Sequence, residues 1–134
     1  MQIKTIKAEE TWALRKTVMW PDRDLEYVKL KEDDQGLHFG LFKDEKLTSV
    51  VSLFVKGEAA QFRKFATLVE EQGKGYGSVL LNHVIDQVQA LGVKTLWCNA
   101  REDKLSFYKK FALTPTEQTF EKGGIRYRIA ERTL

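Results

Sequence analysis

The chain has 134 residues, 43% hydrophobic and 31% charged, a composition that predicts one globular domain over residues 1–134. Its net charge of +3, with basic and acidic residues well mixed, argues against nucleic-acid binding. No apolar run is long enough to span a membrane and no signal peptide is visible, so we expect a cytoplasmic protein with no membrane partner. The single cysteine, Cys98, has apolar neighbours and predicts a buried thiol, with no disulfide and no metal site.

The N-terminal segment predicts one strand followed by two helices. Residues 1–7 alternate as a strand does. Apolar residues recur at helical spacing over residues 9–20, and acidic residues occupy the first turn of that helix. A proline ends it, and a second, shorter helix is expected over residues 22–30, capped by Asp22 or Asp24.

Three β-rich runs follow a polar loop at residues 31–36. The acidic residues of this loop are expected to be solvated. The runs at 37–42 and 47–55 are joined by a short polar turn, which predicts a β-hairpin. A second tight turn leads into a third run at 59–69, so three antiparallel strands are expected here.

The remaining elements are a helix, a strand, a short helix and a final hairpin. A glycine-rich stretch opens a helix over 75–91, which Gly92 ends. A buried strand is expected at 93–99 and a helix at 103–111. Pro115 is expected in the connection to a hairpin that ends in a strand at 125–130. The element order is therefore βααβββαβαββ, an α/β (α+β) protein with about seven strands and four helices.

The glycine-rich stretch Gln72–Ser78 is the strongest functional signal. Three glycines alternate at a strand-to-helix junction, where free backbone N–H groups and the positive end of a helix dipole favour binding of an anion such as phosphate. Gly75 after Lys74 rules out a P-loop, which needs Ser or Thr there. A dinucleotide fingerprint is disfavoured because the stretch follows several strands. The alternative is an ordinary glycine-rich turn before a surface helix.

The pattern Gln72-x-x-Gly75-x-Gly77 resembles the acyl-CoA pyrophosphate loop of the GCN5-related N-acetyltransferase (GNAT) family. Further along the chain, Phe107-Tyr108 and the residues to Leu113 resemble the FYxxxGF signature of that family, with Ala and Leu in place of the final Gly and Phe. The order of elements agrees over nearly the whole chain. Leu14-Arg15, Trp20-Pro21 and Gly36-Leu-His38 further resemble the small ElaA-like branch.

The resemblance implies a GNAT acyl-CoA N-acyltransferase fold with a mixed, mostly antiparallel sheet, whose strands splay to admit the pantetheine arm. It implies acetyl-CoA (coenzyme A) as co-substrate and no metal. Backbone groups before the loop would pair with pantetheine, and the loop would hold the pyrophosphate. The resemblance implies less closely a polar contact with the cofactor arm at the end of the next strand. The cofactor-binding residues expected are Thr67, Leu68, Val69, Gln72, Gly73, Lys74, Gly75, Tyr76, Gly77, Ser78, Asn99 and Arg101.

Tyr108 is the candidate general acid. Acetyl transfer from a thioester to an amine releases a CoA thiolate, and a phenol close to the sulfur could protonate it. Tyrosine in this motif often has that role in the family. The alternative is a core tyrosine that only packs.

No carboxylate stands out as the general base, because the third run of the hairpin region offers only Gln61, Arg63 and Lys64, with Glu58 at its start. Some family members place a catalytic glutamate in that strand. Deprotonation of the acceptor could use water or a residue elsewhere, or need no base at all. The candidates elsewhere are Glu26, Asp34 and His38.

The acceptor site is expected at the first two helices and the strand after them, with Arg15, Trp20 and His38 as substrate residues. Arg15 could hold a substrate carboxylate, or it could form a salt bridge with Asp22 or Asp24 or lie on a solvated helix face. His38 could act as a base, although a hydrogen-bonded structural histidine is the more common situation.

The function expected is acetyl-CoA-dependent N-acetyl transfer to a primary amine of a small molecule or protein, as a monomer or homodimer. The alternative is a non-catalytic acyl-CoA-binding regulatory module with the same fold. A pure protein scaffold is the third hypothesis, and an intact glycine loop argues against it.

Overall fold

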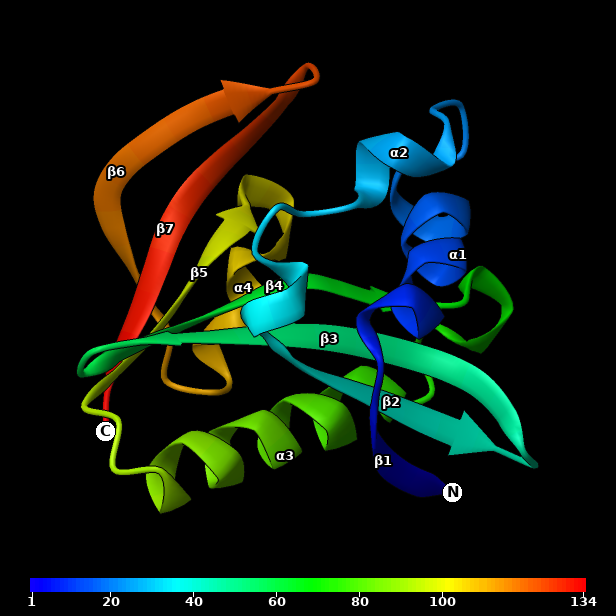
Figure 1. The fold of residues 1–134 in the computed structure, drawn as a ribbon. Coiled ribbons are helices and arrows are strands. Elements are labelled where there is room, and N and C mark those ends of the chain that lie inside the picture. The colour runs from blue at the N-terminus through cyan, green and yellow to red at the C-terminus, as the bar shows by residue number, and fades with distance from the viewer. The chain divides into compact units, whose positions relative to one another are not determined.

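The structure of the protein is a computed structural model that describes all 134 residues. Its element order is the expected βααβββαβαββ (Figure 1), with three short 3-10 turns added between elements. Seven strands form one sheet in the order β1-β2-β3-β4-β5-β7-β6. The ladder between β4 and β5 is parallel, and the ladders β1–β2, β2–β3, β5–β7 and β6–β7 are antiparallel. The predicted fold class is therefore confirmed.

The chain divides into two compact units, which are described separately. The first unit comprises residues 1–54 and 63–84, and the second comprises residues 55–62 and 85–134. Strands β3 (Lys46–Lys56) and β4 (Ala59–Thr67) and helix α3 (Tyr76–Ala90) each contribute residues to both units. The expectation of a single domain over residues 1–134 stays a prediction.

In the first unit, β1 (Gln2–Ile6) and β2 (Leu37–Lys43) form an antiparallel ladder, and β2 continues into a ladder with β3. Helix α1 (Ala8–Met19) buries side chains at three- and four-residue steps, which is the spacing of one helical face. The helix ends one residue earlier than expected, so that Trp20 is its C-terminal cap.

Helix α2 is much shorter than the sequence predicted, extending only over Leu25–Val28. Its start is fixed by Asp24, whose carboxylate accepts a hydrogen bond of 3.1 Å from the backbone N–H of Tyr27. Of the two predicted caps, Asp24 is therefore correct. The loop that follows contains a 3-10 turn at Asp33–Gln35, and Asp33 is buried, so the expectation of a fully solvated acidic loop is wrong.

Strand β4 ends at Thr67, two residues before the predicted limit, and a 3-10 turn at Val69–Glu71 leads to the glycine stretch. Helix α3 begins one residue later than predicted, and Gly92, with φ of +75°, ends it as expected. The buried face of α3 comprises Leu80, Leu81, Val84, Ile85 and Val88, whereas Val79 and Leu91 are exposed.

The second unit contains β5 (Thr95–Arg101), α4 (Leu105–Lys109), β6 (Thr114–Lys122) and β7 (Ile125–Thr133). A 3-10 turn at Glu102–Lys104 replaces the first turn of the helix predicted from residue 103. Pro115 was expected in a connection, but it lies within β6. Because β6 is an edge strand of the sheet and its register shifts after this proline, the missing backbone N–H is tolerated there.

Strand β5 alternates strictly between its two faces. Leu96, Cys98 and Ala100 are buried, whereas Asn99 and Arg101 on the other face are half-buried. The prediction of a buried Cys98 is therefore confirmed, and burial raises the pKa of its thiol to about 12.

We predict that Cys98 resists thiol reagents in the folded protein. A pKa raised from 9.0 to about 12 leaves about a thousandfold less thiolate near pH 8, and the thiolate is the reactive form. Labelling with Ellman's reagent should be negligible in native buffer and reach one thiol per chain in denaturant, with Cys98→Ser as the blank. Stoichiometric labelling of the native protein within minutes would contradict this placement.

Candidate active site

The backbone of the glycine stretch adopts a conformation that only glycine reaches without strain at two positions. Gly73 and Gly75 have φ of +78° and +89°, in the left-handed region. A Cβ atom at either position would meet no atom within 4 Å, so both face open space. Gly77 differs, because its Cβ would come within 3.3 Å of the Phe65 ring, and a small residue is needed there for packing against β4.

The start of α3 presents backbone donors beside these glycines. The first hydrogen bond of the helix runs from the N–H of Val79 to the C=O of Gly75, at 3.1 Å. The N–H groups of Tyr76, Gly77 and Ser78 precede it and have no acceptor within the helix. Together with the helix dipole, these donors make the junction suitable for an anion.

Two lysines lie beside the loop and share one carboxylate. Glu71 Oε2 is 3.2 Å from Lys74 Nζ and 3.2 Å from Lys43 Nζ. The hydrogen bonds from Lys43 and Lys74 lower the pKa of Glu71, and the hydrogen bond to Glu71 raises the pKa of Lys43. Lys43 also lies over the ring of Tyr76, at 5.6 Å from the centroid. The sequence analysis missed Lys43 and Glu71, because nothing in the sequence indicates that the end of β2 reaches the loop.

The segment before the loop is partly committed to internal hydrogen bonds. Leu68 donates its N–H to Thr48 at 2.9 Å and accepts from the N–H of Glu71 at 2.9 Å. The N–H of Leu68 is therefore not available to pair with pantetheine, which limits the expectation for this residue to its C=O. Successive residues of a strand direct their backbone groups to opposite edges. The backbone N–H of Thr67 is therefore expected to point away from β3, to which Leu68 is bonded. The C=O of Thr67 accepts from the Gln72 side chain at 2.9 Å.

In the second unit, Tyr108 lies in α4 within an aromatic cluster. Its ring centroid is 5.8 Å from that of Phe62 and 5.3 Å from that of Phe107. Burial raises the pKa of the phenol, and the Cys98 thiol adds to the rise, while Arg101 opposes it. Tyr108 therefore holds its proton at neutral pH, as a general acid must.

Asn99 and Arg101 both belong to β5, which extends two residues beyond the predicted limit at residue 99. Both are half-buried and lie on the same face of the strand. Arg101 is close enough to Tyr108 to influence the pKa of its hydroxyl. Their proposed contact with the cofactor arm stays a prediction.

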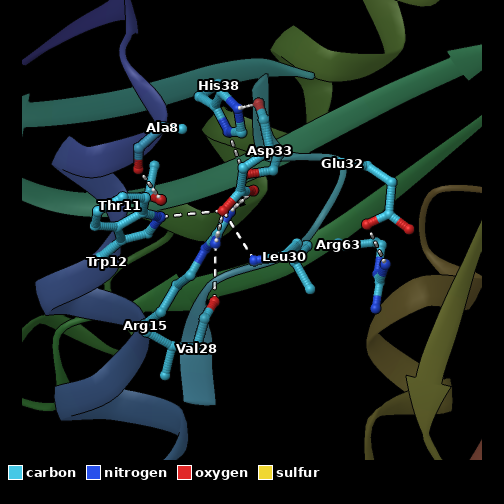
Figure 2. A network of polar contacts seen from close by, with 11 residues as sticks. Ala8, Thr11, Trp12, Arg15, Val28, Leu30, Glu32, Asp33, His38 and Arg63 are labelled. Atoms are coloured by element: carbon cyan, nitrogen blue, oxygen red, sulfur yellow. Dashed lines mark hydrogen bonds and ion pairs between the residues drawn. The ribbon is translucent and has the colours of Figure 1, made fainter. Parts of the chain in front are cut away.

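Arg15 is not available to bind a substrate, because its guanidinium is buried and paired. It is fully buried, and Nη1 and Nη2 each donate to the Asp33 carboxylate at 2.9 Å (Figure 2). Nη1 also donates to the C=O of Val28 and Nη2 to Ser52 Oγ, each at 2.9 Å. The sequence analysis offered Asp22 or Asp24 as ion-pair partners, and both suggestions are wrong.

The Asp33 carboxylate is the centre of this network. Beside Arg15, it accepts hydrogen bonds from Trp12 Nε1 at 3.1 Å and from the N–H of Leu30 at 3.0 Å (Figure 2). Burial alone would raise the pKa of Asp33, but the hydrogen bonds from Arg15, Leu30 and Trp12 outweigh it and lower the pKa. Asp33 is therefore ionised at neutral pH.

His38 is a structural residue whose two ring nitrogens are both used. Nε2 lies 2.7 Å from the C=O of Asp33, which can only accept, so we assign the proton to Nε2. Nδ1 is hydrogen-bonded to Ser52 Oγ at 2.7 Å, and the same oxygen accepts a hydrogen bond from Arg15. A ring whose two nitrogens are both hydrogen-bonded has no nitrogen free to act as a base.

Trp20, the remaining expected substrate residue, differs from Arg15 and His38 because its polar group has no hydrogen-bond partner. Its side chain is 8% exposed, and the indole Nε1 is buried without a hydrogen-bond partner. Trp20 also lines a cavity at the end of α1.

No cluster of three or more His, Cys, Asp or Glu residues that could hold a metal ion occurs in the structure. None of the helices combines the length and hydropathy needed to cross a lipid bilayer.

Comparison with known proteins identifies the class to which this site belongs. A family model described as the acetyltransferase (GNAT) family matches residues 6–112. The uncharacterized N-acetyltransferase YitI of Bacillus subtilis strain 168 is 31% identical over 138 residues, covering 96% of this chain and 93% of that protein.

Two solved structures show the same fold with a coenzyme present. An acetyltransferase from Bacillus subtilis in complex with CoA matches with a TM-score of 0.77 and 17% identity, over 99% of this chain and 98% of that one. A GNAT family acetyltransferase from Elizabethkingia anophelis with acetyl-CoA bound matches with a TM-score of 0.79 and 16% identity, over 99% and 97% of the two chains.

The chain therefore belongs to the acetyltransferase (GNAT) family. It is an N-acetyltransferase, as the loop and the Phe107-Tyr108 pair predicted. These findings do not favour the alternative of a non-catalytic acyl-CoA-binding module. Membership of the ElaA-like branch stays a prediction.

We predict that Asp33→Asn destabilises the protein by about 3–4 kcal/mol, because it leaves the buried Arg15 charge without its counter-ion. Urea unfolding at pH 7 measures this, and the exposed neighbour Asp34→Asn is the control, with an expected change below about 0.5 kcal/mol. Because the folded-state pKa of Asp33 is lowered, the wild-type advantage is fully present above about pH 4 and declines as the pH falls further. Equal stabilities for the two variants would refute the role of the pair.

Proposed function

We propose that the protein transfers the acetyl group of acetyl-CoA directly to a primary amine, with both substrates bound together. The observation that carries this proposal is the exposed glycine loop at the start of α3, with its free backbone donors, in a chain of the acetyltransferase family. The proposal includes a cytoplasmic location and a monomer or homodimer.

The pyrophosphate of acetyl-CoA would bind the N–H groups from Gly73 to Ser78. The open space at Gly73 and Gly75 and the positive φ of both support this fit. Lys43 and Lys74, held next to the loop by Glu71, would add positive charge for the phosphates. The pantetheine arm would pair with the backbone N–H groups of Thr67 and Val69, because the N–H of Leu68 is already bonded and the C=O groups of Thr67 and Val69 accept from Gln72.

In the proposed reaction, the neutral amine nitrogen attacks the thioester carbonyl carbon, and the C–S bond breaks as the amide forms. Tyr108 donates its proton to the departing sulfur, and the new ammonium loses its extra proton to water. The raised pKa of Tyr108 supports this role, because the phenol stays protonated throughout the neutral range. His38 is excluded as the base by its two hydrogen bonds.

The cofactor proposal is tested by thermal unfolding with and without acetyl-CoA. A ligand present at about 100 times its Kd should raise the wild-type Tm by on the order of 5–10 °C. Gly75→Glu should abolish the shift, because a carboxylate at this position repels the pyrophosphate. The matched control is Gly57→Glu, which adds the same charge at another open glycine with φ of +62°. An unchanged shift in Gly75→Glu would place the cofactor elsewhere, and no shift in the wild type would reject acetyl-CoA binding.

The catalytic proposal predicts that Tyr108→Phe lowers kcat about 100-fold with little change in the acetyl-CoA-dependent Tm shift. Because the pKa of Tyr108 is raised and the acid must be protonated, wild-type kcat should not fall up to about pH 10 on account of this residue. Tyr127→Phe, at another buried tyrosine, is the control and should keep wild-type kcat. A fully active Tyr108→Phe variant would contradict the role as general acid and show that Tyr108 only packs against its neighbours.

A further inference from the structure

The end of the β2–β3 hairpin places two lysines directly opposite each other. Lys43, the last residue of β2, pairs in the ladder with Lys46, the first residue of β3. Both residues of the turn between them lie in the left-handed region, Asp44 with φ of +51° and Glu45 with φ of +67°. Like charges in directly opposite positions of neighbouring strands destabilise a sheet. The hairpin end therefore needs counter-charges from another segment.

The counter-charges come from the 3-10 turn that precedes the glycine loop. Glu71 Oε2 lies 3.2 Å from Lys43 Nζ, and Glu70 Oε1 lies 3.7 Å from Lys46 Nζ. Glu71 Oε2 is also 3.2 Å from Nζ of Lys74, which belongs to the loop itself. All of these residues lie in the first unit. Three lysines and two glutamates thus join the hairpin end to the loop, and one positive charge among them is not compensated.

Lys43 and Lys74 form a pair of ammonium groups that a ligand can reach. Their side chains are 37% and 49% exposed, whereas that of Glu71 is 17% exposed. Both ammonium nitrogens contact the same carboxylate oxygen, so they are no farther apart than twice 3.2 Å. Each ammonium has three N–H donors, and the bond to Glu71 uses one of them. One phosphate group can therefore bridge the two nitrogens with hydrogen bonds of about 2.8 Å.

The two ammonium groups lie beside the start of α3. The Lys43 ammonium is 5.6 Å from the centroid of the Tyr76 ring, and Tyr76 is the first residue of that helix. Lys74 lies between Gly73 and Gly75, the two glycines that face open space. A ligand bound to the unpaired backbone donors of the loop therefore has two cations next to it.

The co-substrate that we propose for the loop carries two kinds of phosphate. Its pyrophosphate is a diester and suits a row of backbone N–H groups at a helix start. Its 3′-phosphate is a monoester on the ribose, with a charge of about −1.5 to −2 at pH 7 and three acceptor oxygens. The compact charge of an ammonium group suits such a monoester. The backbone donors of the loop account for the pyrophosphate and leave the 3′-phosphate without a cation.

We propose that Lys43 and Lys74 together bind the 3′-phosphate of CoA, and that this contact makes the protein distinguish CoA from 3′-dephospho-CoA. The phosphate takes the ammonium donors that point away from Glu71, while Glu71 keeps both lysines within reach of one ligand. The inference rests on the proposed binding of acetyl-CoA at the loop.

The proposal is tested by isothermal titration calorimetry of the intact protein with CoA and with 3′-dephospho-CoA. The wild type should bind CoA at least tenfold more tightly. Lys43→Met and Lys74→Met remove the charge and keep an unbranched side chain, and each should weaken CoA binding at least threefold. The Kd for 3′-dephospho-CoA should stay within twofold, because the backbone donors still hold the pyrophosphate. The matched control is Lys56→Met, at the exposed lysine that ends β3, which should bind both ligands as the wild type does.

The double variant with Lys43→Met and Lys74→Met should bind the two ligands with equal Kd. Its Tm without ligand, measured beside that of the wild type, checks that it is folded. Equal affinity of the wild type for CoA and 3′-dephospho-CoA would overturn the proposal. Single variants that lose affinity for both ligands by the same factor would also overturn it, since the lysines would then serve the pyrophosphate.

Failure of this inference and failure of the proposed function give different results. Equal binding of both ligands, together with acetyl transfer to an amine, would retain the proposed function and reject the contact with the 3′-phosphate. Absence of binding for both ligands would reject the co-substrate itself and, with it, this contact.

Discussion

The buried ion pair between Arg15 and Asp33 is the constraint on which the N-terminal half of the protein depends. A fully buried guanidinium is tolerable only when its charge is compensated, and Asp33 supplies the opposite charge and accepts two of its four hydrogen bonds. The same network reaches β3 through Ser52 and β2 through His38. It therefore holds α1 and the segment after α2 to the strands of the first unit. Trp20 is the C-terminal cap of α1, the helix that carries Arg15.

The recognition that we propose for the cofactor depends mainly on the backbone of the glycine loop. The loop offers N–H groups at the start of α3, and its glycines matter because they permit the conformation and leave space. Such a site leaves a short and recognisable pattern in the sequence.

The sequence predicted the order and type of every helix and strand, because alternation, helical spacing and turn residues are local signals. It did not predict the partner of Arg15. Asp22 and Asp24 are nearer in the chain, and Asp33 looks like a solvated residue in an acidic run until tertiary packing buries it. Nor could it show that the backbone of Leu68 is already bonded, since that depends on the neighbouring strand. The expectations that failed are those that depend on contacts between distant segments.

The central claim is that the start of α3 holds the pyrophosphate of the co-substrate through its backbone. Titrating ¹⁵N-labelled protein with CoA and following the backbone amide signals tests it most directly. The account predicts the largest, saturable changes in the amides of Gly73 to Ser78, where the donors lie unpaired at the helix start. Saturable changes centred on other segments, with these amides unmoved, would contradict it.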